Sequence, residues 1–359
     1  MVESTSADAL PRRNLLASVL VVCTIGSPVL AQQPRPAERP AARTFPVSTS
    51  LVQLDVLTRD SRTGLPAPDL KKEDFRVFDD GDEVPVAAFA SGDLDTRPVA
   101  LWMVVICNSP VWRVPQALRS GSFVGRERLF RPALDDLDKR DRVGVAHWCD
   151  NGEALLDLRP SEDSDAAITV LEGVLKPYGT RQESRVGELT LQNLVRRVIV
   201  DALAEDPRPL PVLVFLHSDY TGMPPRELDS LASDFLKTSG IVYGIMNDSL
   251  ECSEEPMGEV DGSGFFRNGE RGRVLRYLAK LTGGQYFKVA ESRYAAALET
   301  IITHLHLRYQ LGFEPRKIDG KRHRLKVELT KDARQMNRTV ELRARLEYIP
   351  VADKPGSAR

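Results

Sequence analysis

The stretch LWMVVICNSPVW, residues 101–112, decides the fold that we expect for the centre of the chain. Its apolar run up to Ile106 is typical of a strand that is buried on both faces, as in a parallel sheet between two layers of helices. In α/β domains that bind a metal, such a strand usually ends in a carboxylate. Here it is followed by Cys107, Asn108 and Ser109. The stretch therefore predicts the sheet and raises the question of a lost metal site.

Further apolar runs follow at 143–148, 212–217, 241–246 and 286–289, with helical patterns such as 186–203 and 295–307 between them. Alternating strands and helices predict a doubly wound, mostly parallel α/β sheet, which we place at residues 95–307. The turn residues Asp150 to Glu153 join 143–148 to 154–158. This hairpin predicts one antiparallel strand at the edge of the sheet.

Both flanks of this domain have the alternating pattern of β-strands. Residues 51–56 and 75–78 alternate on the N-terminal side, and residues 324–329 and 340–346 alternate on the C-terminal side, around a polar, charged loop. A fragment of about 45 residues buries too little apolar surface to be stable alone. We therefore predict that segments 45–94 and 308–349 pair into one small all-β sandwich, into which the α/β domain is inserted.

The composition is that of an ordinary globular chain. Its 359 residues carry a formal net charge of −2, and 42% of them are hydrophobic. This length predicts roughly two domains. Nothing in the charge balance indicates nucleic acid as a partner.

The first 31 residues are typical of a secretory signal. Arg12 and Arg13 precede an apolar run at 15–25, and cleavage is expected after Ala31. That run is shorter than the roughly 20 residues that a membrane span requires, and no later run is long enough. We expect a secreted or periplasmic protein without a transmembrane segment. A Pro/Ala/Arg-rich linker at 32–44 and a tail at 350–359 are expected to be disordered.

Three stretches resemble one family. They are VQLDVLTRDSRTGLPAPDLKKEDFRVFDDGDEVPVAAFA before the central domain, LAKLTGGQYFKV near its end, and YQLGFEPRKIDGKRHRLKVEL after it. With the hairpin after the second central strand, they resemble the von Willebrand factor type A domain, and most closely the secreted, acidobacterial-type VWFA-related family. The resemblance extends from about residue 47 to 349. It implies a protein-binding module.

Members of this family that bind a metal carry Asp-x-Ser-x-Ser after the first strand, a Thr in a later loop and an Asp after the fourth strand. The corresponding positions here are Cys107, Ser109, Thr190 and Asp219. Only one of the remaining oxygen ligands carries a full charge, whereas a hard cation prefers about six oxygens. The metal-ion-dependent adhesion site (MIDAS) is therefore expected to be degenerate. We predict no cofactor and, at most, weak binding of Mg²⁺ or Mn²⁺.

Cys107 and Cys149 each follow a parallel strand, and the expected strand order makes these strands neighbours. Neighbouring strands lie about 4.8 Å apart, and a disulfide needs Cα atoms roughly 4.4 to 6.8 Å apart. A Cys107–Cys149 disulfide across the former metal site is therefore one hypothesis. The alternative is two buried free thiols. With the Cys107–Cys149 bridge, Cys252 would be the leftover thiol.

No catalytic arrangement is present in the sequence. His217-Ser218-Asp219 has no glycine-flanked nucleophile elbow. His304 and His306 are two residues apart on a predicted helix, so they cannot bind one ion. His147 is expected to be a core histidine, and Gly283 to end a helix rather than to bind phosphate. We predict that the protein is not an enzyme.

The loop from 251 to 273 is long for a compact domain, and such loops are often functional. Phe265 and Phe266 in its middle are candidate anchors for a partner, together with Ser109 and Asp219. We predict a non-enzymatic module that binds another envelope or extracellular protein at the carboxyl ends of the parallel strands. The alternative is a metal-dependent adhesin, in which a carboxylate of the partner completes a partial site at Ser109, Thr190 and Asp219.

Overall fold

The computed structural model describes residues 51–66, 69–92, 96–106, 130–148, 154–174, 192–198, 208–216, 225–247 and 273–350. All of them belong to one compact unit, Ala42–Arg359. None of the helices in these ranges has the length and apolarity that crossing a membrane requires.

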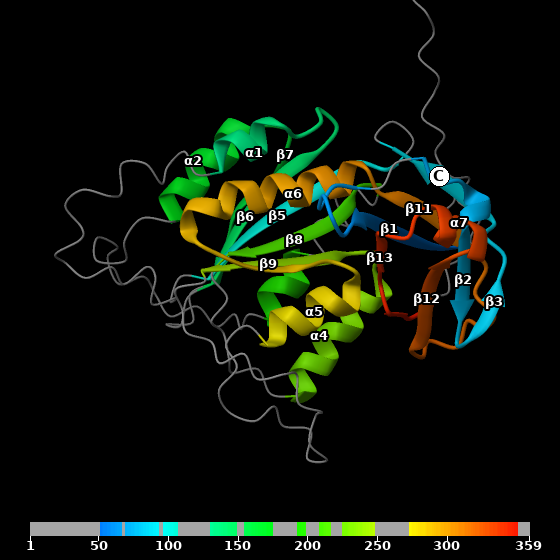
Figure 1. The fold of residues 1–359 in the computed structure, drawn as a ribbon. Coiled ribbons are helices and arrows are strands. Elements are labelled where there is room, and N and C mark those ends of the chain that lie inside the picture. The colour runs from blue at the N-terminus through cyan, green and yellow to red at the C-terminus, as the bar shows by residue number, and fades with distance from the viewer. Residues whose placement is uncertain are drawn as a thin grey trace, which may run out of the picture. The chain divides into compact units, whose positions relative to one another are not determined.

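The centre of this unit is a six-stranded sheet (Figure 1). In spatial order its strands are β10 (Tyr286–Val289), β9 (Ile241–Asn247), β8 (Leu210–Leu216), β5 (Val99–Ile106), β6 (Arg142–Trp148) and β7 (Ala154–Ser161). The first five run parallel, and β7 pairs antiparallel with β6. The mixed α/β fold, the mostly parallel sheet and the antiparallel edge hairpin are thus confirmed.

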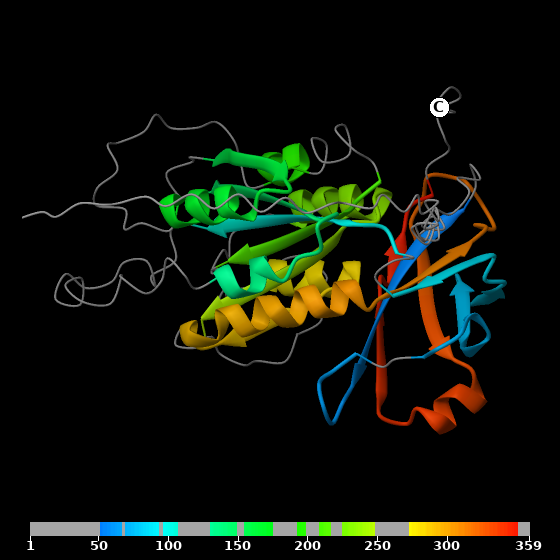
Figure 2. The same ribbon diagram turned by 90° about the horizontal axis from the view of Figure 1, so that it is seen from above.

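Helices cover both faces of this sheet (Figures 1 and 2). They are α1 (Arg131–Asp135), α2 (Ser164–Val174) and α6 (Tyr294–His306) on one face, and α4 (Pro225–Lys237), α5 (Arg273–Thr282) and the helical residues 192–198 on the other. Every residue of β5 is buried. Met103 packs toward the first layer, and Val104 toward the second. Two buried faces explain why the strand is continuously apolar.

Among the described residues, Trp102 has the largest fully buried side chain, and its size restricts the residue opposite it in the sheet to glycine. Its register partner on β6 is Gly144. A Cβ atom at Gly144 would lie 2.7 Å from Trp102 Cε3. The indole therefore occupies the space that any larger residue at 144 would need.

Strands from both ends of the chain form two further sheets, each with four antiparallel strands. The first contains β13 (Val340–Ala344), β1 (Val52–Asp60), β11 (Tyr309–Phe313) and β4 (Ala88–Ser91). The second contains β14 (Glu347–Tyr348), β12 (His323–Leu329), β2 (Phe75–Asp79) and β3 (Asp82–Val84). Both contribute to one hydrophobic cluster, to which Leu54 and Val77 belong.

One element of the C-terminal segment differs from the expectation. The polar, charged loop expected after residue 329 contains a helix, α7 (Lys331–Met336). The hydroxyl of Thr330 accepts a hydrogen bond from Ala333 N at 3.4 Å, which caps the helix, and Ala333 is fully buried. A six-residue helix is too short to show a hydrophobic period, so the cap was the available signal.

Candidate functional site

The carboxyl edge of the parallel sheet is the site that the sequence predicts. Strands β6, β5 and β8 lie next to one another and run in the same direction, so their last residues meet at one edge. Ile106 is the register partner of Trp148, and Val105 is the partner of Leu216. The expectation that β5 and β6 are neighbours is confirmed.

The residues predicted for this site lie outside the described residues. They are Cys107, Ser109, Cys149, Thr190, Asp219, Cys252, Phe265 and Phe266, and the cleavage position Ala31 also lies there. The ligand positions, the disulfide and the partner contacts therefore stay predictions.

Of the histidines that the sequence analysis set aside, His217 lies outside the described residues, and His147, His304 and His306 each have their own acceptor. His147 Nδ1 lies 2.7 Å from Asp157 Oδ2 on the neighbouring strand β7. His304 Nε2 lies 3.3 Å from the carbonyl oxygen of Gly64, and His306 Nε2 lies 2.6 Å from a carboxylate oxygen of Asp141. The two histidines of α6 do not converge on one point, as predicted.

Gly283 ends helix α5, which confirms its predicted role. Its φ of +84° is in the left-handed region, which favours glycine at the end of a helix. Strand β10 begins three residues later, at Tyr286. The alternation expected at residues 324–329 is present in β12, where Arg324 and Lys326 are exposed, whereas Leu325 and Leu329 are buried.

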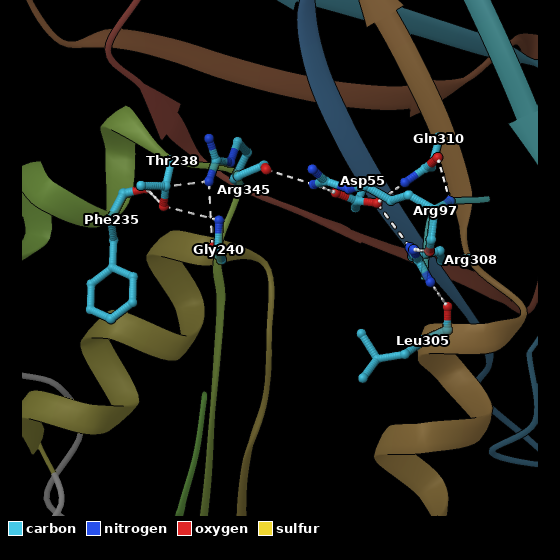
Figure 3. A network of polar contacts seen from close by, with 10 residues as sticks. Asp55, Arg97, Phe235, Thr238, Gly240, Leu305, Arg308, Gln310 and Arg345 are labelled. Carbon is cyan, nitrogen blue, oxygen red and sulfur yellow. Dashed lines mark hydrogen bonds and ion pairs between the residues drawn. The ribbon is translucent and has the colours of Figure 1, made fainter. Parts of the chain in front are cut away.

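Sequence analysis missed a buried charged network between β1, the start of β5 and the end of α6 (Figure 3). Asp55 Oδ1 accepts hydrogen bonds from Arg308 Nε at 2.9 Å and from Gln310 Nε2 at 2.8 Å. Asp55 Oδ2 accepts one from Arg97 Nη2 at 3.0 Å. Arg308 also donates to the carbonyl oxygens of Leu305 and Arg97. The network ties the flanking strands to the central domain.

The charges in this network are not balanced. Burial alone would raise the pKa of Asp55, but Arg97 and Arg308 hold it below its usual value. Burial lowers the pKa of Arg345 to about 10, and this side chain has only long contacts of 3.5 Å to the carbonyl oxygens of Phe235 and Gly240. Two guanidinium groups, those of Arg97 and Arg308, thus contact one carboxylate, and removal of this carboxylate would leave both without their counter-charge.

A second polar cluster lies in a different sheet. Within the described residues, the side chains that could together hold a metal ion are Asp79, Asp80 and His323, on β2, the turn after it and β12. The sequence analysis assigned no role to these three residues, which lie next to the alternating runs 75–78 and 324–329. The signal that it overlooked was a histidine at the first position of β12 in an otherwise alternating pattern.

No family model and no curated protein matches this chain. Similar solved structures include the conserved hypothetical protein BatB from Bacteroides thetaiotaomicron, at 16% identity and a TM-score of 0.39, over 58% of this chain and 97% of that one. A von Willebrand factor type A protein from Catenulispora acidiphila has 12% identity and a TM-score of 0.38, over 79% and 78% of the two chains.

Proximal thread matrix protein 1 from the mussel byssus, solved with zinc in its MIDAS motif, has 10% identity and a TM-score of 0.37, over 63% of this chain and 49% of that one. At scores this low, none of these similarities supports an inference about function.

Proposed function

We propose that this chain is an exported, non-enzymatic binding module in which a type A-like domain, inserted in a β-sandwich, contacts another envelope or extracellular protein. The contact surface is the carboxyl edge of the parallel sheet. One observation carries the proposal: β6, β5 and β8 end side by side at this edge. In open α/β sheets ligands bind at the carboxyl ends of the strands.

The residues that follow these strands in the sequence fit a protein contact better than a metal site. Cys107 takes the place of the first carboxylate, and Ser109, Thr190 and Asp219 offer a single charged ligand. A divalent hard cation would keep most of its water there. The aromatic pair Phe265 and Phe266 would supply apolar contact area of the kind found at the centre of protein interfaces.

The strand register supports the disulfide hypothesis. Ile106 and Trp148 are partners in the parallel pair, and Cys107 and Cys149 are the next residue of each strand. If the pairing continues by one residue, both side chains point to the same face, with Cα atoms about 4.8 Å apart. That separation lies within the disulfide range. A bridge here would replace the metal with a covalent link.

The binding function is tested by affinity capture from the envelope fraction of the source cells. We compare the wild-type chain with Asp219→Ala and with the double variant Phe265→Ser and Phe266→Ser. The matched control is Lys139→Ala, because Lys139 is exposed just before β6, at the opposite edge of the sheet. We expect one protein to be retained by the wild type and the control, and to be lost from the edge variants. Equal capture by all four chains would refute the proposed surface.

Two further measurements address the chemistry of the edge. Mass spectrometry of the exported protein, alkylated without reduction, should show a linked Cys107–Cys149 peptide and alkylated Cys252; three alkylated cysteines would refute the bridge. Thermal denaturation with millimolar Mg²⁺ should match that with chelator, because a cation that binds only the folded state would raise its stability. A clear rise that Asp219→Ala abolishes would instead favour the metal-dependent adhesin.

A further inference from the structure

The turn between β2 and β3 presents acidic residues to the first residue of β12. Asp79 pairs with Asp82 across a two-residue turn, in which Asp80 and Gly81 have φ angles of +51° and +95°. Two hydrogen bonds of 2.9 Å fix this turn to β12, from Asp80 N to Arg324 O and from Arg324 N to Asp80 Oδ1. The turn and the start of β12 therefore form one rigid frame.

Three potential ligand atoms converge in this frame. His323 Nδ1 lies 2.9 Å from Asp80 Oδ2 and 3.6 Å from Asp79 Oδ1. Asp79, Asp80 and His323 each offer one ligand atom, and these three atoms lie within 4.8 Å of one another. The side chains of Asp79 and His323 are only 1% and 5% exposed, whereas that of Asp80 is 53% exposed. The cluster is thus built on two buried groups and opens to solvent at the third.

One atom of each of the two buried side chains makes no hydrogen bond within the described part of the chain. Asp79 Oδ1 and His323 Nδ1 make no well-aligned hydrogen bond, and their close polar contacts are the ion pairs of 3.6 Å with each other and of 2.9 Å between His323 Nδ1 and Asp80 Oδ2. Asp79 Oδ2 accepts only a long bond of 3.3 Å from Arg316 N. Because burying an unpaired carboxylate oxygen is costly, these atoms indicate a missing ligand.

The far side of the imidazole is held in the manner of a metal ligand. His323 Nε2 lies 3.0 Å from Asp319 Oδ1. A histidine that binds a metal through one ring nitrogen commonly donates its other N–H to a carboxylate, which fixes the tautomer and orients the ring. If Nε2 donates its N–H to Asp319, the neutral imidazole carries its lone pair on Nδ1, which can then bind a metal.

We propose that Asp79 Oδ1, Asp80 Oδ2 and His323 Nδ1 bind a divalent transition metal of the zinc class, with Asp319 as the outer carboxylate. Tetrahedral bonds of about 2.1 Å place neighbouring ligand atoms about 3.4 Å apart. The separations of 2.9 and 3.6 Å from His323 Nδ1 lie on either side of this value. One imidazole and two carboxylates suit Zn²⁺ better than Mg²⁺ or Ca²⁺ and neutralise its charge, and water would complete the shell.

A proton on His323 Nδ1 would compete with the metal for this nitrogen. A doubly protonated His323 would face Asp79, Asp80 and Asp319 with both ring nitrogens, while Lys317, Arg316 and the Tyr348 hydroxyl are the other groups nearby. The cluster would then be an ion-pair network without a metal. Because the metal needs the neutral imidazole, its binding should release a proton and strengthen as the pH rises.

Calorimetric titration with Zn²⁺ tests the proposal, on the full chain with its thiols blocked by alkylation so that cysteines do not bind the metal. Asp80→Asn is the main variant, since Asn tolerates a positive φ and keeps the acceptor for Arg324 N. Asp82→Asn is the matched control, an exposed acid in the same turn that pairs with Arg316. Circular dichroism verifies that each variant is folded.

We expect one Zn²⁺ per wild-type chain and per Asp82→Asn chain, and at least about ten-fold weaker binding by Asp80→Asn. Asp319→Asn should weaken binding by about 10- to 100-fold, as outer-shell changes do. Mg²⁺ and Ca²⁺ should bind far more weakly than Zn²⁺ to the wild type. Absence of Zn²⁺ binding by the wild type, or equal binding by Asp80→Asn, would overturn the proposal and leave the proton as the occupant.

Discussion

Asp55 and Asp79 are two buried aspartates on the flanking strands, and they differ in how many hydrogen bonds their carboxylates accept. Asp55 receives hydrogen bonds from Arg97, Arg308 and Gln310 within about 3 Å. Asp79 receives a single long bond to one oxygen and none to the other. Burial alone does not distinguish them, because both side chains are at most 3% exposed.

This difference separates a buried carboxylate that stabilises the fold from one that is available to bind a ligand. A buried carboxylate whose oxygens all have donors is explained by the fold, here as the link between β1 and the central domain. A buried carboxylate with an unmet oxygen is not explained by the fold alone. The first kind should matter most to stability, and the second to the binding of a ligand.

The largest effect is expected from Asp55→Asn. It leaves Arg97 and Arg308 buried without their counter-charge, and breaking a buried ion pair in this way typically costs about 3–5 kcal/mol. Urea denaturation of the purified protein measures the loss. A cost below about 1 kcal/mol would mean that water or another group compensates the guanidinium groups.

A smaller effect on stability is expected from Asp79→Asn in metal-free protein, about 1 kcal/mol or less, because only one weak hydrogen bond is affected. The larger effect of Asp79→Asn should be the loss of the stabilisation that Zn²⁺ gives to the wild type. The wild type should gain about 2.7 kcal/mol at a hundred-fold excess over its dissociation constant, and the variant nothing. Thermal denaturation with and without Zn²⁺ decides this. An equal gain in both proteins would place the metal elsewhere.

The pH dependence of stability should carry opposite contributions from two histidines. Burial lowers the pKa of His323, but Asp319, Asp80 and Asp79 outweigh it, so the pKa is raised above 6.5. In metal-free protein its stabilisation is therefore full below about pH 6.5 and is lost as the pH rises through the raised pKa. Burial lowers the pKa of His304 from 6.5, so stability is lost as the pH falls from that value toward the lowered pKa.

Urea denaturation from mildly acidic to mildly alkaline pH, on His323→Gln and His304→Gln, separates these contributions. Each variant should change the slope of stability against pH by less than one proton, in opposite directions. Changes in the same direction would contradict the surroundings described for one of the two imidazoles.

The smallest effect is expected from Asp82→Asn, which removes the ion pair between Asp82, at the β2–β3 turn, and Arg316, which follows β11. Both side chains are more than half exposed, at 67% and 52%, and exposed pairs contribute little. We expect no measurable change in urea denaturation or in the Zn²⁺ titration. A change in the titration would extend the metal site to Asp82.

Much of the central sheet could be predicted from sequence because its signals are local. The expected end of the first strand at Ile106 and the expected strand at 286–289 agree with β5 and β10, and the hairpin between β6 and β7 follows from four turn residues. A strand covered on both faces must be apolar throughout, whatever its partners are. Helix α7 was missed because six residues are too few for a period.

The charged clusters could not be predicted in this way. Asp55 and Arg308 are 253 residues apart, and Asp80 and Arg324 are 244 apart. In sequence these residues resemble ordinary polar positions of half-exposed strands. Their roles depend on which strands become neighbours, which no local pattern records.

The sequence by itself thus determined the buried strands, the edge hairpin and the alternation along β12, because each follows from side-chain size, polarity and backbone preference over a few residues. Only the tertiary structure decided that Asp55 lies among guanidinium groups and that Asp79 lies against His323 with an unmet oxygen. The energy of a buried charge depends on the atoms within a few ångströms of it, and the fold brings those atoms from distant parts of the chain.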